Sequence, residues 1–103
     1  AGAWQLLHVR PAWEGNHSDD AFVIFAWSGP GDLRRLVAVN YAQHSSQCYV
    51  EFAWDDLAGR AWRLQDTMGE AVYDRDGGQL AQQGLYLDLP AWGYHVFAVT
   101  QQV

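Results

Sequence analysis

The feature that most constrains the fold is a series of short apolar runs separated by turn-forming residues. In residues 85–89, for example, three leucines alternate with Tyr86 and Asp88. Alternation with a period of two is typical of a strand that buries one face. The sequence predicts about eight strands on this basis. They cover residues 3–10, 21–28, 35–41, 47–53, 61–67, 71–75, 85–89 and 94–99.

The residues between these runs favour turns rather than helices. Gly29-Pro30-Gly31-Asp32 predicts a tight turn, and therefore a hairpin over residues 21–41. Residues 76–84 predict a loop with one helical turn around Leu80. No segment keeps a helical period over ten residues, which argues against an α/β fold. Short strands with frequent turns favour an all-β fold, either a β-sandwich or a small barrel, in a single domain over residues 1–103.

Composition narrows the partners that we expect. The net charge of −6 argues against binding to nucleic acid or to an anionic membrane surface, because both favour a basic protein. No apolar run reaches the roughly 18 residues of a membrane-spanning helix. Cys48 is the only cysteine, so no disulfide can form within the chain. We expect Cys48 to be a small buried apolar side chain rather than a reactive thiol.

The acidic residues and histidines do not form a recognisable active site. Glycoside hydrolysis needs two carboxyl groups roughly 5–10 Å apart. Asp55 and Asp56 would point to opposite faces of a strand, and the segment from Asp74 to Asp76 is typical of a turn. A calcium loop there is the alternative, but it needs more oxygen ligands. The histidines lack metal-ligand spacing, and phosphate-loop and nucleophile-elbow motifs are missing. The sequence predicts no catalytic residue, no metal site and no cofactor.

Six tryptophans in 103 residues are the remaining distinctive feature. We expect the three inside strand patterns to fill the core: Trp4, Trp27 and Trp62. The other three lie at loop or strand-end positions: Trp13, Trp54 and Trp92. Tryptophans at such positions either stack on sugar rings or dock one domain onto another. Both interpretations are open for these three residues.

Several segments, taken in order, resemble the C-terminal all-β domain of bacterial α-amylase-family glycoside hydrolases. They include Leu-Val-Ala-Val-Asn-Tyr at 36–41, Gln-Cys-Tyr-Val at 47–50 and Leu-Ala-Gly-Arg-Ala-Trp-Arg-Leu-Gln-Asp at 57–66. Tyr-Asp-Arg-Asp-Gly at 73–77 and the long closing segment 84–97 complete the set. Strands at 2–10 and 22–27 also fit, so the resemblance covers nearly the whole chain.

The resemblance implies an antiparallel Greek-key β-sandwich of eight strands, packed behind a catalytic (β/α)8 barrel. The catalytic carboxylates of that family lie on the barrel, and no position here corresponds to them. We therefore expect a non-catalytic accessory domain of a larger enzyme that acts on α-glucan. The alternative is a carbohydrate-binding module for starch, glycogen or maltooligosaccharide. A small stand-alone enzyme is disfavoured. The single cysteine and the lack of a signal-peptide pattern favour the bacterial cytoplasm.

Overall fold

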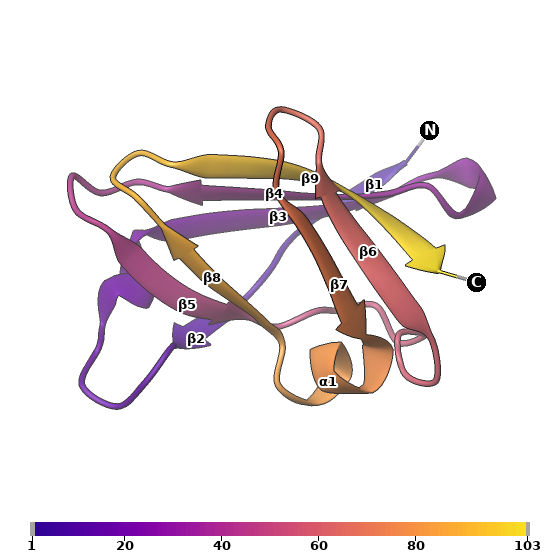
Figure 1. Ribbon diagram of the computed structural model, residues 1–103, viewed down its shortest axis with the longest axis horizontal. Coiled ribbons are helices and arrows are strands. Elements are labelled where there is room, and N and C mark those ends of the chain that lie inside the picture. Colours follow the sequence, from indigo (N-terminus) through magenta and orange to yellow (C-terminus); the bar gives the residue numbers. More distant parts are fainter. Residues whose placement is uncertain (1, 103) are drawn as a thin grey trace.

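The computed structural model describes residues 2–102. Within this range the chain forms nine strands and three short helical segments, joined by loops (Figure 1). The strands are β1 (Ala3–Leu6), β2 (Val9–Pro11), β3 (Phe22–Ser28), β4 (Arg34–Asn40), β5 (Ser46–Val50), β6 (Ala61–Asp66), β7 (Val72–Asp76), β8 (Leu85–Leu89) and β9 (Tyr94–Gln102). The helical segments are the 3₁₀ turns η1 (Ser18–Ala21) and η2 (Pro30–Asp32) and the helix α1 (Gly77–Gln82).

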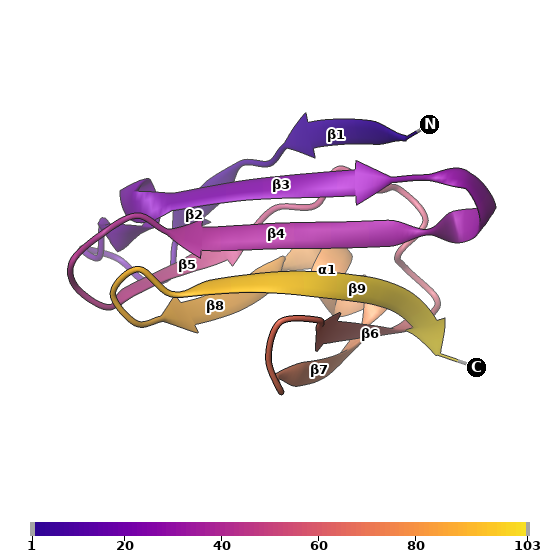
Figure 2. The same ribbon diagram turned by 90° about the horizontal axis from the view of Figure 1, so that it is seen from above.

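The strands form two antiparallel sheets that pack as a sandwich (Figure 1, Figure 2). One sheet has six strands in the order β1-β3-β4-β9-β6-β7, and the other has three in the order β2-β5-β8. After β4 the chain crosses to the three-stranded sheet. The strand that pairs with the free edge of β4 is β9, the last strand of the chain. The predicted antiparallel Greek-key sandwich is confirmed. So is the hairpin over residues 21–41, which β3 and β4 form.

The first predicted strand is divided into two. Residues 3–10 were expected to be continuous, but β1 pairs with β3 in the large sheet and β2 pairs with β5 in the small one. The chain changes sheets at Leu7, which is buried and donates its N–H to Ile24 O at 2.9 Å. The division makes nine strands instead of eight.

Alternation along the strands places the core between the two sheets. Leu85, Leu87 and Leu89 of β8 are buried, while Tyr86 and Asp88 between them are exposed. The same pattern buries alternate residues of β3, β4, β5 and β6. Because burial of a strand face requires an opposing layer, these inward faces fix which side of each sheet meets the other.

Cys48 is completely buried within this core. Burial raises the pKa of its thiol to about 12, and the nearby Asp19 carboxylate adds to the effect. A thiol in this state is a poor nucleophile, because the reactive species is the thiolate. The expectation of a buried apolar cysteine is confirmed.

The helix α1 lies against the connection between β5 and β6. The side chain of Asp76 caps its first turn by accepting from Gln79 N at 3.2 Å. Gly77 lies so close to this connection that an added Cβ would be 1.6 Å from Leu57 O. The predicted helical turn around Leu80 is present as α1, and Leu80 is buried. In residues 2–102, no helix has both the length and the apolar character needed to cross a membrane.

Candidate functional site

The side of the six-stranded sheet that points away from the core is apolar over four neighbouring strands. Residues that are paired across antiparallel strands lie on the same face. Trp4 pairs with Trp27, Leu6 pairs with Phe25, and Phe25 continues to Val37 on β4. We call this surface the outer face. It consists of Trp4, Leu6, Val23, Phe25, Trp27, Arg35, Val37, Val39, Tyr94, Val96 and Ala98.

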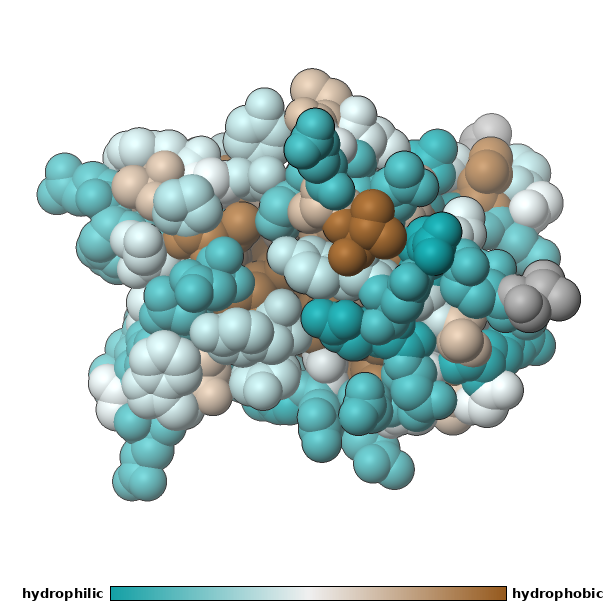
Figure 3. Space-filling model, viewed as in Figure 1, coloured by the Kyte–Doolittle hydropathy of each residue, from teal (hydrophilic) through white to brown (hydrophobic). Residues whose placement is uncertain are grey.

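No element of residues 2–102 covers the outer face. Figure 2 looks onto β1, β3, β4 and β9, and the small sheet and α1 lie behind them. Trp4 and Leu6 each expose more than 60% of their surface, and Tyr94 exposes 52%. By contrast, the side over β7, β8 and α1 is largely hydrophilic (Figure 3). A contiguous exposed apolar surface is characteristic of an interaction site.

The aromatic residues of the outer face contact one another. The rings of Trp4 and Phe25 meet edge to face with centroids 6.4 Å apart, and those of Trp4 and Trp27 are 6.3 Å apart. The Trp27 ring also covers two glycines, since a Cβ on Gly2 or Gly29 would lie within 2.5 Å of it. These contacts hold the aromatic end of the face in a defined arrangement.

Of the three tryptophans expected in the core, only Trp62 is fully buried. The prediction for Trp4 is wrong, because Trp4 is 61% exposed on the outer face. Every residue of β1 is exposed, so within the described residues no layer packs against either side of this edge strand. Trp27 lies on the outer face of β3 and is half-buried there instead of pointing into the core.

The three tryptophans predicted to bind sugar or a domain do not form one surface. Trp13 and Trp92 are exposed, whereas Trp54 is half-buried. Trp54 stacks on Phe52 with ring centroids 5.7 Å apart and donates Nε1–H to Ser28 Oγ at 2.8 Å. The loops that carry Trp13 and Trp92 lie at one end of the sandwich, and the β5–β6 connection that carries Trp54 reaches the other (Figure 1). A binding role for each residue stays a prediction.

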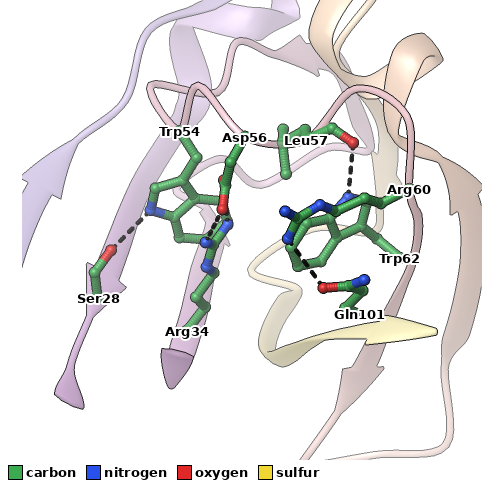
Figure 4. A network of polar contacts seen from close by, with 8 residues as sticks. All are labelled: Ser28, Arg34, Trp54, Asp56, Leu57, Arg60, Trp62 and Gln101. Carbon is green, nitrogen blue, oxygen red and sulfur yellow. Dashed lines mark hydrogen bonds and ion pairs between the residues drawn. The ribbon is translucent and has the colours of Figure 1, made fainter. Parts of the chain in front are cut away.

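Trp54 belongs to a network that fastens the β5–β6 connection to the large sheet (Figure 4). The Arg34 guanidinium lies 5.1 Å from the ring centroid of Trp54 and 4.8 Å from that of Trp62. Its two terminal nitrogens donate to the carboxylate of Asp56 at 2.8 and 2.5 Å. The hydrogen bond from Arg34 lowers the pKa of Asp56. Asp56 is therefore a charged structural partner of Arg34 and is unsuited to act as a general acid.

Sequence reasoning missed a second internal pair, Asp66 with His95. Asp66 Oδ2 lies 2.6 Å from His95 Nδ1, and Oδ1 accepts from the backbone of Met68 at 2.9 Å and of Val96 at 3.3 Å. Burial of Asp66 opposes its ionisation, but these hydrogen bonds outweigh it and lower its pKa. Within residues 2–102, no three histidine, cysteine, aspartate or glutamate side chains come together to hold a metal ion.

No family model matches the chain, and no curated protein matches it. The outer face was not foreseen, although the sequence carries a sign of it. Residues 22–27 are apolar at every position, which indicates a strand with apolar residues on both faces.

The Asp66 pair predicts how stability depends on pH. The unfolded carboxyl has a pKa of about 3.9, and the folded one is lower. The contribution of the Asp66 carboxylate to the free energy of unfolding is therefore fully present above about pH 3.9, and it is lost as the pH falls through the pKa of the folded state. Asp66→Asn should lower the free energy of unfolding by roughly 1–3 kcal/mol at pH 7. The difference from wild type should shrink in acid, as measured by urea unfolding at a series of pH values.

Asp74 provides the control for this measurement, because its ion pair with Arg63 is exposed. Asp74→Asn should change stability less than Asp66→Asn at neutral pH, since exposed ion pairs contribute little. A deficit in Asp66→Asn that stays constant down to the acid limit would show that the carboxylate charge is not its source.

Proposed function

We propose that this chain is the non-catalytic C-terminal accessory domain of an α-amylase-family glycoside hydrolase, and that it packs on the catalytic (β/α)8 barrel and stabilises it. The observation that carries the proposal is the outer face, an apolar surface over β1, β3, β4 and β9 that no part of residues 2–102 covers. The resemblance in the sequence supports the choice of partner. In this proposal, the outer face contacts the catalytic barrel, and the barrel carries the residues that catalyse hydrolysis.

The composition of the outer face suits a permanent contact. Interface cores are depleted in charge and enriched in aromatic residues. Arg35 is the only charged residue on this face, and four of its eleven members are aromatic. Apolar surface contributes about 25 cal/mol for each Å² that is buried, so covering Trp4 and Phe25 alone would stabilise the contact by several kcal/mol. A partner that covers this face therefore gains stability from the contact.

Phe25→Lys in the full-length protein tests the proposal. Phe25 lies in the middle of the outer face, and a lysine there would be an unpaired charge inside the interface. We expect the melting temperature of the catalytic domain to fall by several degrees and limited proteolysis to release the accessory domain faster. Differential scanning calorimetry and gel analysis of timed digests measure the two effects.

Met68→Lys is the control, because Met68 is also an exposed apolar residue, at 65% against 39% for Phe25, but lies in the β6–β7 turn, away from the outer face. It should leave both measurements unchanged. Equal behaviour of Phe25→Lys and Met68→Lys would rule out docking through the outer face. A reading frame that encodes no barrel together with this domain would refute the proposal as a whole.

A further inference from the structure

The exposed side of the three-stranded sheet carries a pair of tyrosines framed by polar groups. Tyr49 on β5 is opposite Tyr86 on β8, and their ring centroids are 5.4 Å apart. The neighbouring pair on the same side is Gln47 with Asp88, and Arg10 on β2 is opposite Tyr49. We call these five residues the tyrosine strip. It lies on the sheet opposite to the proposed docking surface.

The polar end of the tyrosine strip is held in a fixed orientation. The Gln47 side chain accepts from Asn16 Nδ2 at 2.9 Å and donates to Asp88 Oδ1 at 3.0 Å. Asn16 is itself oriented, since its Oδ1 accepts from the backbone and the hydroxyl of Ser18 at 2.9 and 2.7 Å. A prearranged amide and carboxylate lose little entropy when a ligand binds them.

At its other end, the tyrosine strip opens into a cleft of about 260 Å³. Arg10 joins the two, because its guanidinium lies 4.8 Å from the centroid of Tyr49 and also lines the cleft. Within the cleft, Arg10 donates to the backbone carbonyl of Gln83 and lies 3.8 Å from Glu51. Phe52 and Leu80 add apolar surface, and Gln82 adds a further amide.

The chemistry of these groups selects one class of ligand. Asp88 and Glu51 outnumber the single cation, so the site disfavours phosphate and other anions. Carboxylates and amides throughout the site make it too polar for a lipid chain. A pyranose ring fits, because its C–H face can pack on tyrosine while its hydroxyls bond to carboxylate, amide and guanidinium groups. From Gln47 to Glu51, the chain extends about 13 Å at 3.3 Å per residue, which is longer than one sugar ring.

We infer that the tyrosine strip and the adjoining cleft bind a neutral oligosaccharide. The tyrosine rings pack against the sugar faces, and Asp88, Gln47 and Arg10 bond to hydroxyls. The inference does not depend on the docking proposal, because the two surfaces lie on opposite sheets. Loss of one function by mutation would leave the other intact.

Titration of the 103-residue chain with maltoheptaose, and separately with cellohexaose, tests the inference. Sugar concentrations up to about 10 mM would reveal even a weak site. We expect at least one of the two sugars to shift amide resonances of β5 and β8 in NMR spectra. The preferred sugar then shows whether the site selects α- or β-linked glucose.

Substitutions identify the residues that bind. Tyr86→Thr keeps a strand-forming residue and should weaken binding at least about tenfold. Asp88→Asn is a second, milder change that should also weaken binding. Tyr41→Ala is the control, since Tyr41 is an exposed tyrosine in the β4–β5 connection, outside both the tyrosine strip and the outer face, and it should bind like wild type.

Three outcomes would overturn the inference. The first is the absence of any resonance shift on β5 or β8 with either sugar. The second is undiminished binding in Tyr86→Thr and Asp88→Asn. The third is loss of binding in Trp92→Ala but not in Tyr86→Thr, which would place the sugar at a loop tryptophan instead.

Discussion

Replacing Trp62 with alanine should lower the free energy of unfolding by about 3–5 kcal/mol. The Trp62 side chain is 3% exposed, and its Nε1–H donates to Leu57 O at 2.9 Å. Alanine would leave a large cavity and a buried carbonyl without its donor. Arg34 would also lose one of the two rings that flank its guanidinium (Figure 4). The loss would affect core packing and the β5–β6 connection together.

Urea unfolding followed by circular dichroism measures this change, and two variants separate its causes. Trp62→Phe keeps much of the ring volume but removes the Nε1 donor, so its cost should lie between those of wild type and Trp62→Ala. Trp13→Ala removes an exposed indole and should change stability by less than about 0.5 kcal/mol. A cost below about 1 kcal/mol for Trp62→Ala would contradict the packing described for β6.

The second large effect is expected at Asn40, where Asn40→Asp should cost roughly 2–4 kcal/mol. Asn40 is completely buried at the end of β4, and its Nδ2 donates to the carbonyls of His44, Leu89 and Pro90 at 3.0, 3.2 and 3.0 Å. These bonds tie the β4–β5 connection to the β8–β9 turn. Aspartate has nearly the same shape but offers no such donors, and a carboxylate would face three carbonyl oxygens.

Thermal and urea unfolding at pH 7 measure the cost, with Gln43→Ala as the control. Gln43 is exposed in the same connection, and its replacement should change stability by less than about 0.5 kcal/mol. A burial penalty should also make Asn40→Asp less destabilising in acid, where the carboxyl is protonated. Wild-type stability in Asn40→Asp would show that the three carbonyls do not need this amide.

Local pattern predicted most of the strands and the inward faces. The leucines of β8 and the pair Trp62 and Leu64 of β6 are buried as their alternation indicates. Such predictions succeed because side-chain direction in a strand depends only on its period. Cys48 was placed correctly for the same reason.

The parts that the sequence did not predict depend on distant segments. Trp4 alternates like a core residue, but in the part of the chain that the structure describes no second layer extends to β1. The tyrosine strip needs the pairing of β5 with β8, which are separated by more than thirty residues. Arg34 and Asp56 likewise meet only because the β5–β6 connection returns to β4. Pairing over such distances is set by tertiary packing, and a single sequence does not reveal it.

The outer face bears on where the hydrophobic core of this domain ends. Strands β3, β4 and β9 carry apolar residues on both sides, one side toward the small sheet and the other toward the outer face. With a partner in place, these strands would be the middle layer of a three-layer stack. Their amides would then be shielded from solvent on both sides, and the large sheet would belong to two hydrophobic cores at once.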